Sequence, residues 1–327
     1  MTRTIRWGIL GPGGIAKRFA TDLRRADHAE LVAVGSREAD RAAAFAAEFG
    51  AARSYGSYTE LLSDKEVDIV YVATPHSSHC EHTVLCLEHG KAVLCEKPLA
   101  VNAAQAAEMV NAAQAHNLFL MEAMWTRHLP IMAKVRQWLA SKRIGEVRML
   151  TADFGFRVDV HPEQRLFNPW LAGGALLDVG VYTIALAQMV FGRVPSSIRA
   201  TADKLETGVD GQTAMILGYD GGELALLSCA VRLNSPQEAR ILGTRGSITI
   251  PSFWRATQAT LQPDGLDPVQ ATGDASYHYE AIEAGYCLRT GKVQSALMPW
   301  NESLEIARIM DAVRQQIGVI YPMEQDS

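Results

Sequence analysis

A glycine-rich turn near the start of the chain constrains the fold more than any other feature. Ile5 to Leu10 is an apolar run typical of a buried strand, and it leads directly into the sequence GPGGIA at positions 11–16. In this G-x-G-x-x-A pattern, Gly11 makes the turn, Gly13 lets backbone approach a pyrophosphate, and Ala16 allows close packing of helix on strand. A helix predicted to about Arg25 completes the required context. The sequence therefore predicts a dinucleotide-binding domain.

The end of the second predicted strand indicates which dinucleotide binds. Leu31 to Val34 is followed by Gly35, Ser36 and Arg37, where an NAD site usually carries an Asp or Glu for the ribose hydroxyls. A hydroxyl and a guanidinium suit a 2′-phosphate instead, because Arg makes strong bidentate contacts with phosphate. Arg41 follows one helical turn later. We therefore predict NADP, with NAD as the alternative if Arg37 and Arg41 form only a solvated helix face.

A lysine that could take part in catalysis follows another predicted strand. Ala92 to Cys95 is apolar, and Glu96 and Lys97 follow it. Pro98 favours an extended Lys97 and permits a cis peptide bond. Ligands bind at the carboxyl ends of strands in open α/β sheets, so a cation there could orient a hydroxyl and lower its pKa. The alternative is an ordinary surface lysine before a helix.

Histidines follow the strand predicted at Val67 to Ala73. The strand ends in Thr74, Pro75 and His76, and a helix then carries His79 and His82. No acidic or cysteine partner completes a recognised zinc pattern, so we predict no metal; a zinc-binding histidine cluster is the alternative. His79 is a candidate substrate or proton-relay group. The predicted cofactor-binding residues are Gly11, Gly13, Gly14, Ile15, Ser36, Arg37, Arg41, Thr74, Pro75, His76, Glu96 and Lys97.

The order of predicted elements divides the chain into two domains. Strand–helix alternation predicts an α/β, Rossmann-type, doubly wound parallel sheet over residues 1–122. From Val147 strands follow one another, with Asp220 to Gly222 as a hairpin signal and Gln262 to Asp274 as a Pro/Gly/Asp-rich loop. Residues 123–327 are therefore predicted to form an α+β domain with a large, open, mostly antiparallel sheet. One face would cover an inserted helix, and the other is wide enough for a homodimer or a dimer of dimers.

The inserted helix is expected around residues 173–182, sequence GGALLDVGVY. Asp178 and Tyr182 are four positions apart, so on a helix they share one face and can act on one small molecule. Polar groups inside an otherwise apolar helix need partners or a polar cavity. The alternative is a core tyrosine with a satisfied hydroxyl and an aspartate near the positive end of the helix dipole.

Composition limits the classes of partner. The net charge is −5 and no long basic run occurs, which argues against nucleic acid and anionic membranes. The N-terminus passes straight into a strand, and no apolar run of about 20 residues stands out, so we expect neither a signal peptide nor a membrane span. Five scattered cysteines without a CxxC pair fit reduced thiols. We therefore expect a cytoplasmic protein with a small-molecule substrate.

These motifs together resemble the glucose–fructose oxidoreductase / inositol dehydrogenase / rhizopine catabolism (Gfo/Idh/MocA) superfamily over nearly the whole chain. The resemblance rests on residues 8–16 (GILGPGGIA), 96–98 (EKP) and 178–182 (DVGVY). Residues 92–98, 119–127 and 173–178 are most similar to its branch of dimeric dihydrodiol and NADP-dependent D-xylose dehydrogenases.

The resemblance implies a site and a reaction. Lys97, Asp178 and Tyr182 are implied to meet at the nicotinamide, with His79 nearby. Trp125, Phe154 and Trp254 become candidates for an aromatic wall beside the substrate, or else are core or interface residues. The segment before Tyr277 is shorter than in the dihydrodiol enzymes, which leaves a sugar substrate open.

The predicted function is NADP-dependent hydride transfer between the nicotinamide and a hydroxyl-bearing carbon of a sugar, polyol or trans-dihydrodiol. Either Tyr182, as a phenolate stabilised by Lys97, or Lys97 itself could take the hydroxyl proton. Asp178 is expected to bind a substrate hydroxyl. One alternative is an aldose–aldose type oxidoreductase that keeps NADP bound through turnover. The other is a non-catalytic, dinucleotide-binding regulator.

Overall fold

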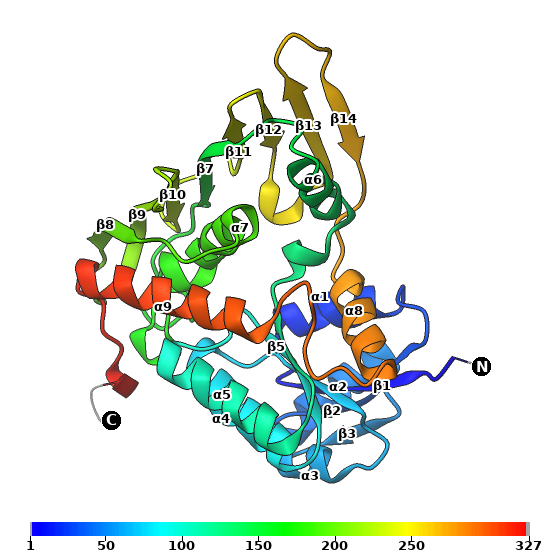
Figure 1. Ribbon diagram of the computed structural model, residues 1–327. Coiled ribbons are helices and arrows are strands. Elements are labelled where there is room, and N and C mark those ends of the chain that lie inside the picture. The colour runs from blue at the N-terminus through cyan, green and yellow to red at the C-terminus, as the bar shows by residue number, and fades with distance from the viewer. Residues whose placement is uncertain (1, 325–327) are drawn as a thin grey trace. The chain divides into compact units, whose positions relative to one another are not determined.

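The chain packs as two compact units. The computed structural model describes residues 2–324, which are coloured in Figure 1. Among the described residues, the first unit contains 2–125 together with 276–304, and the second contains 126–275 together with 305–324. Residues 276–304 lie within the predicted second domain (123–327), whereas in the structure this segment packs with the first unit.

The first unit is built on a six-stranded parallel sheet. Its spatial order is β3-β2-β1-β4-β5-β6, and every neighbouring pair is parallel. The order reverses beside β1, which defines a doubly wound Rossmann sheet and confirms the prediction. Apolar strand residues fill the core on both faces, so β4 and β5 are buried along their whole length. The strands are β1 Ile5–Leu10, β2 Ala29–Gly35, β3 Arg53–Tyr55, β4 Ile69–Val72, β5 Ala92–Glu96 and β6 Leu120–Ala123.

Helices connect these strands, and one late segment joins them. The connecting helices are α1 Gly14–Leu23, α2 Ala39–Phe49, α3 Tyr58–Ser63, α4 His79–Glu88 and α5 Ala103–His116. Helix α8, His278–Arg289, lies beside α1 (Figure 1). The Asp22 carboxylate of α1 accepts hydrogen bonds from the Ser276 hydroxyl at 2.6 Å and the Tyr277 amide at 2.8 Å. These partly buried polar contacts help to hold the returning segment in the first unit.

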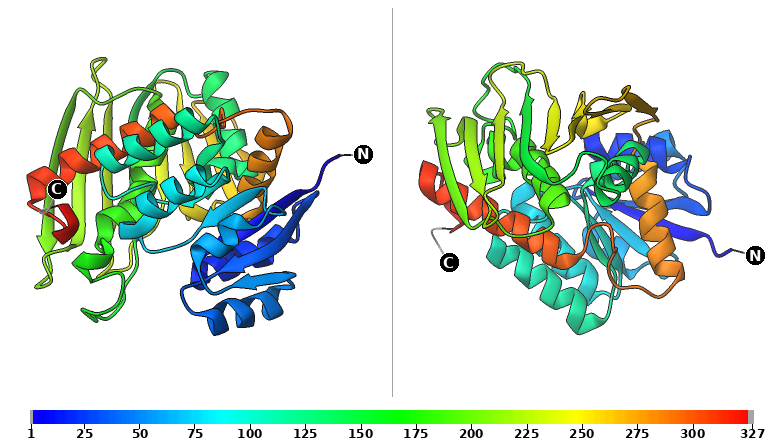
Figure 2. Two further views of the ribbon diagram at one scale, coloured as in Figure 1. Left: turned by 90° about the horizontal axis from the view of Figure 1, so that it is seen from below. Right: turned by 45° about the horizontal axis from the view of Figure 1, so that its top comes forward.

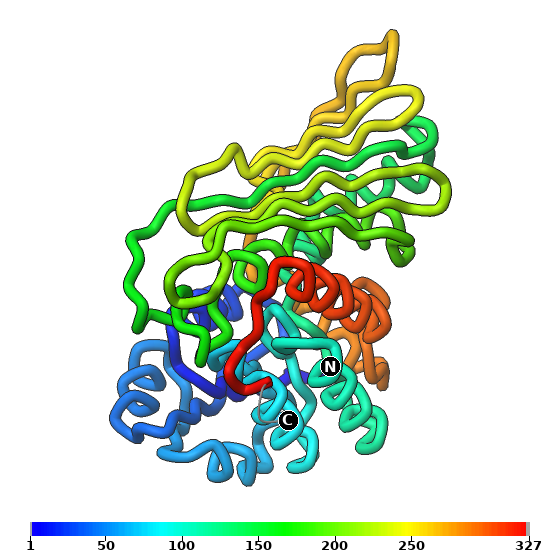
Figure 3. Tube along the Cα trace, turned by 90° about the vertical axis from the view of Figure 1, so that its left-hand side faces the viewer, coloured from blue at the N-terminus to red at the C-terminus, as the bar shows by residue number. Residues whose placement is uncertain are grey.

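The second unit is organised around an eight-stranded sheet. Figure 3 shows its strands side by side, in the order β14-β13-β12-β11-β7-β10-β9-β8. All pairs are antiparallel except β10 with β7, which confirms the predicted large, mostly antiparallel sheet. The prediction of a loop over Gln262 to Asp274 was wrong in part, because β13 and β14 form a hairpin there. The strands are β7 Val147–Gly155, β8 Ser197–Lys204, β9 Asp210–Gly218, β10 Leu224–Ala230, β11 Ala239–Gly243, β12 Gly246–Ile250, β13 Gln258–Pro263 and β14 Val269–Thr272.

One face of this sheet is covered by an apolar helix. A π-helical turn, Leu176–Gly180, continues into α7, Val181–Phe191, and both pack on β7 and β10 (Figure 2, right). Alternation along β9 and β10 places Met215, Leu217 and Leu227 under the helix. Helix α6, Pro130–Ala140, also belongs to this unit, and α9, Trp300–Ile317, begins in the first unit and ends in the second.

The helix that covers the sheet also corrects the expectation that no apolar run is long enough to span a membrane. The stretch Pro169–Phe191 has the length and apolarity of a membrane span, although sequence analysis found no such run. In the structure 83% of its apolar window is buried within the protein. This burial is the behaviour of a core helix.

Candidate functional site

The glycine turn after β1 leaves the N-terminus of α1 open to a ligand. Gly11 has φ of +89°, and a side chain there would press on the backbone of Ala73. Added Cβ atoms at Gly13 and Gly14 would meet nothing within 4 Å. Among the described residues no side chain caps the helix and no acid lies in its first turn. Helix amides that face open space without a protein acceptor fit the pyrophosphate of a dinucleotide.

The end of β2 gathers cations where a ribose would lie. Ser36 is buried and its hydroxyl accepts a hydrogen bond from the Glu38 amide at 3.2 Å. Arg37 and Arg41 are exposed, and Arg41 pairs with Glu38 at 3.2 Å. Burial raises the pKa of Tyr58, and the charges of both arginines oppose this rise, which places its ring beside them. The cluster is positively charged and reachable, as a 2′-phosphate requires.

The ring of His82 extends this cluster toward β4. It contacts the Tyr58 ring edge-on at 4.8 Å, and its Nδ1 lies 3.0 Å from the Thr74 hydroxyl. Burial lowers the pKa of His82, and the nearby Arg37 lowers it further while Glu81 opposes both. The sequence did not predict that His82 and Tyr58 join this cluster, because the two residues come from different helices.

The turn that carries Lys97 is held by buried acids. The Lys97–Pro98 bond is cis, as the sequence permits. The Glu96 carboxylate accepts hydrogen bonds from the Tyr71 hydroxyl and, at 3.1 Å, from the Lys97 amide. Beyond the proline, the Leu99 amide donates to Glu122 Oε1 at 3.1 Å. Lys97 itself is only partly buried. The turn therefore presents a cation from a fixed backbone at the carboxyl edge of the sheet.

His79 links this turn to the end of β4. Its side chain is fully buried, with Nδ1 at 2.8 Å from the Pro98 carbonyl and Nε2 at 2.9 Å from the Thr74 carbonyl. Burial lowers the pKa of His79 to about 4, although both carbonyl contacts oppose the shift. Both nitrogens therefore engage backbone that borders the cofactor edge. A direct proton-relay role for His79 stays a prediction.

The histidine spacing does not build a metal centre. His76 is buried, and its ring packs edge-on against His79 at 5.7 Å. Over residues 2–324, no three His, Cys, Asp or Glu side chains lie where they could hold a metal ion.

The second unit places Asp178 and Tyr182 on one helix, as the sequence predicts. Asp178 lies in the π-helical turn and Tyr182 in the first turn of α7, and their exposed fractions are 7% and 6%. Asp178 Oδ1 pairs with Arg165 Nη2 at 2.9 Å. Arg165 was not predicted from the sequence, because it lies in an irregular stretch where no periodicity marks it.

The three candidate aromatic residues separate into two groups. Phe154 stacks on Trp254 with ring centroids 4.8 Å apart, and it lies 5.5 Å from the Tyr182 ring. Trp125 belongs to the first unit, where it stacks on Tyr277 at 4.3 Å. The second unit therefore places Phe154 beside Tyr182 and stacks Trp254 on Phe154, and the first unit provides an aromatic pair that includes an unpredicted tyrosine.

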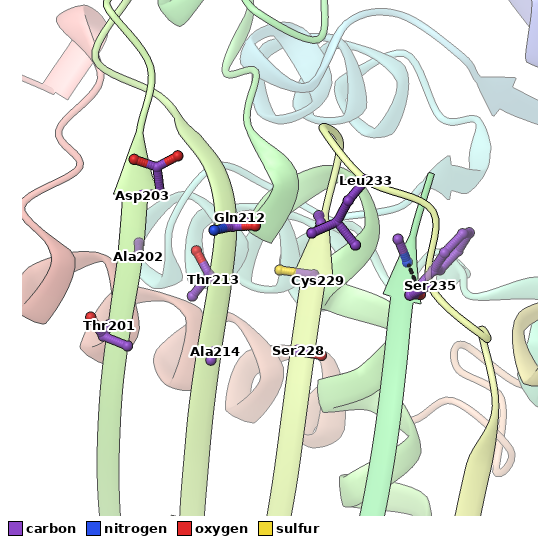
Figure 4. A pocket seen from close by; sticks show the side chains of 13 residues that line it. Thr201, Ala202, Asp203, Gln212, Thr213, Ala214, Ser228, Cys229, Leu233 and Ser235 are labelled. Atoms are coloured by element: carbon purple, nitrogen blue, oxygen red, sulfur yellow. Dashed lines mark hydrogen bonds between the residues drawn. The ribbon is translucent and has the colours of Figure 1, made fainter. Parts of the chain in front are cut away.

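A hollow opens at the end of the large sheet near Phe154. Its volume is about 460 Å³. Figure 4 shows its lining from β8, β9 and β10 and from the segment after β10, with Asp203 as its one acidic side chain. The Gly155 amide donates to the Ser235 hydroxyl at 2.7 Å along its rim. Apart from Asp203, the side chains that line the hollow are uncharged.

Glu280 of α8 is a buried acid that sequence analysis also missed. It is fully buried, and within the described residues neither carboxylate oxygen has a hydrogen-bond partner. Burial, followed by the charges of Glu96 and Asp22, raises its pKa well above the usual value for glutamate. An uncharged acid is the form that this site favours.

We expect Glu280→Gln to change how stability depends on pH. A neutral buried acid stabilises the fold fully below its unfolded-state pKa, and this contribution is lost as pH rises through its folded-state pKa. Over that window the wild type should lose about 1.4 kcal/mol of unfolding free energy per pH unit relative to E280Q. Chemical denaturation from about pH 5 to about pH 9 measures the difference. Glu283→Gln, on the same helix, is the control, and parallel pH curves for wild type and E280Q would contradict a raised pKa. The other groups around this site are Arg18, Asp22, Tyr71, Glu96 and Tyr277.

Family comparisons agree with this geometry. Residues 5–124 match the oxidoreductase family with an NAD-binding Rossmann fold, and residues 132–249 match the Gfo/Idh/MocA C-terminal domain. The chain therefore belongs to the Gfo/Idh/MocA family of NAD(P)-dependent oxidoreductases. This confirms the predicted family, fold and cofactor class.

Individual relatives are similar along nearly their whole length. The chain is 38% identical to trans-1,2-dihydrobenzene-1,2-diol dehydrogenase of Xenopus tropicalis, covering 97% of this chain and 99% of that protein. It is 37% identical to D-xylose 1-dehydrogenase (NADP(+)) of Hypocrea jecorina, covering 98% and 93%. Among solved structures, the 3-ketoreductase KijD10 of Actinomadura kijaniata, in complex with NADP and TDP-benzene, is 27% identical with a TM-score of 0.85. That match covers 96% of this chain and 98% of KijD10.

Proposed function

We propose that the protein is an NADP-dependent dehydrogenase that oxidises, reversibly, a hydroxyl-bearing carbon of a sugar, polyol or trans-dihydrodiol. The main support for this proposal is that candidate cofactor-binding and catalytic groups gather at one edge of the sheet in the first unit. The open N-terminus of α1, the Ser36–Arg37 cluster and Lys97 all follow the carboxyl ends of strands in the same parallel sheet. Dehydrogenase relatives that cover nearly the whole chain support the same function.

In this proposal three side chains and the cofactor have separate roles. NADP, when bound, supplies the hydride acceptor at the nicotinamide ring. Lys97 of the first unit stabilises negative charge as the hydroxyl proton leaves. Tyr182 of the second unit receives that proton or orients the hydroxyl, and Asp178 binds a neighbouring hydroxyl of the substrate. Oxidation of the hydroxyl-bearing carbon to a carbonyl releases the hydroxyl proton, and these side chains would receive it and hold the substrate in place.

The preference for NADP is tested by Arg37→Gln. Loss of one charge-assisted contact to a 2′-phosphate should raise the dissociation constant for NADPH by about 10- to 100-fold. NADH lacks this phosphate, so its affinity should be unchanged. Fluorescence titration of the purified protein with each reduced cofactor measures both constants.

Arg3→Gln is the matched control, because Arg3 is an exposed arginine of the same unit that pairs with Asp68 rather than facing the cofactor edge. Equal losses for NADPH and NADH in R37Q, or no loss for either, would contradict the assignment of Ser36 and Arg37 to a 2′-phosphate.

We also propose that the protein forms a homodimer through the uncovered face of the large sheet. Ile216 on β9 lies opposite Leu226 on β10, and their exposed fractions are 47% and 38%. Arg199 on β8 flanks Ile216 in register. A hollow of about 470 Å³ runs over these three strands. An apolar row with a basic neighbour on a flat sheet suits a self-complementary interface.

Ile216→Asp tests this interface. In a two-fold interface the substitution buries two negative charges, one from each protomer. We therefore expect the variant to be a monomer where the wild type is a dimer. Light scattering after size exclusion gives the mass. Val194→Asp is the control, because Val194 is 56% exposed in the loop before β8. A monomeric wild type at micromolar concentration would refute the dimer.

Finally, we propose a cytoplasmic location. All five cysteines are free and buried, which supports a reducing compartment.

A further inference from the structure

The turn that begins the Asp178 helix is held by buried polar groups from distant parts of the second unit. Asp210, at the start of β9, is fully buried, and its Oδ2 accepts hydrogen bonds from the Leu176 amide at 2.8 Å and the Thr213 hydroxyl at 2.7 Å. The Tyr321 hydroxyl, also fully buried, donates to the Gly173 carbonyl at 2.7 Å. Buried side chains thus fix the backbone on both sides of Gly174.

The two glycines of this turn are packed so closely that neither position has room for a side chain. A side chain at Gly173 would collide with the carbonyl oxygens of Arg165 and Leu166, and one at Gly174 would collide with Asp210 Oδ1. Gly174 has φ of +113°, and its amide donates to the Leu166 carbonyl at 2.8 Å. Asp210 therefore packs against one side of the turn, and the segment that carries Arg165 packs against the other side.

This arrangement connects Asp210 to the Asp178–Arg165 pair. Leu176, whose amide Asp210 accepts, is the first residue of the π-helical turn, and Asp178 lies two residues later. Wide turns of this kind are rare and need support from their surroundings. A carboxylate at the first amides of a helix supplies both a hydrogen bond and a favourable charge.

We propose that Asp210 is a positioning residue, which acts through the Leu176 amide to fix the π-helical turn and so aims Asp178 and its partner Arg165 at the substrate. This inference rests on the proposed function, in which Asp178 binds a substrate hydroxyl. Asp210 does not touch substrate or cofactor in this account. Its effect reaches the reaction only through the placement of Asp178.

The test is a double-mutant cycle on kcat/KM for the best substrate, with wild type, D210A, D178N and the double variant. Displacement of a substrate-binding group by a fraction of an ångström to 1 Å costs about 10- to 100-fold, so D210A should lose that much. In the D178N background, D210A should cost less than about twofold, because its route to the reaction is already removed. NADPH affinity should be unchanged in all four proteins, since the cofactor edge belongs to the first unit.

Conservative variants keep the test decisive if D210A does not fold. Asp210→Asn retains an acceptor for the Leu176 amide and should restore most of kcat/KM. Thr213→Val removes one donor to Asp210 and should lose about threefold, again only when Asp178 is intact. Equal losses from these substitutions with and without Asp178 would reduce Asp210 to a purely structural residue and overturn the proposal.

The cycle separates this inference from the proposed function. If D178N retains full turnover, the role of Asp178 in the proposed function fails. If D178N is impaired while D210A and T213V keep wild-type kcat/KM, the proposed function stands and the positioning role of Asp210 is refuted.

Discussion

Lys97→Met should abolish turnover while leaving cofactor binding intact. Methionine keeps the length and most of the volume of lysine, but it cannot stabilise the anion that forms as the hydroxyl proton leaves. We expect kcat to fall by about 10²- to 10⁴-fold, the range for loss of an acid–base or charge-stabilising group. The NADPH dissociation constant should change by less than about threefold, because the glycine turn and Arg37 carry most cofactor contacts in our proposal.

Lys65→Met is the matched control for this variant. Lys65 is an exposed lysine of the same unit that precedes β4, at the amino edge of the sheet. It should keep wild-type kinetics and wild-type affinity. Ordinary turnover by K97M would exclude Lys97 from the chemistry, whereas loss of NADPH binding would assign it to the cofactor alone.

Tyr182→Phe should produce the second large effect. The substitution removes one hydroxyl and keeps the ring beside Phe154. If the phenol transfers the proton, kcat falls by about 10²-fold or more and one limb of the pH profile of kcat/KM disappears. We expect this result, because Tyr182 shares its helix with Asp178 and is buried.

Tyr219→Phe provides the comparison for Tyr182. Tyr219 is a buried tyrosine of the same unit whose hydroxyl has no hydrogen-bond partner among residues 2–324. Its loss should leave kinetics unchanged. A higher KM with an intact pH profile in Y182F would indicate that Lys97, and not Tyr182, accepts the proton.

Local patterns explain which parts of the fold could be predicted. The GPGGIA turn, the apolar strands and the Glu96–Lys97–Pro98 run each combine a short spacing with a known geometric need, and the structure confirms the Rossmann sheet built on them. The return of residues 276–304 could not be predicted, because it depends on Asp22 meeting Ser276 and Tyr277 across more than two hundred positions. Strand β14 was not predicted, because the glycines and prolines of the surrounding segment indicate a loop more strongly than its four residues indicate a strand.

The candidate site was likewise predictable only where its residues lie in a periodic element. Asp178 and Tyr182 stand four apart on one helix, so their shared face follows from sequence. Arg165 lies in an irregular segment, and Asp210 follows a turn at a strand start, so both depend on tertiary packing. Glu280 would pass for an exposed helix residue, and only the contact of α8 with α1 reveals that it is buried.

The most direct test of the account is turnover with a free cofactor. Purified protein is mixed with NADP or NAD and a panel of aldoses, inositols and trans-dihydrodiols, and absorbance of the reduced nicotinamide is followed. Protein without substrate is scanned first for cofactor that is already bound, which would indicate an oxidoreductase that keeps NADP through its cycle. We predict steady reduction of NADP by at least one sugar, polyol or diol, with much slower reduction of NAD. Tight NADP binding with no turnover of any substrate would contradict a dehydrogenase and indicate a dinucleotide-binding regulator.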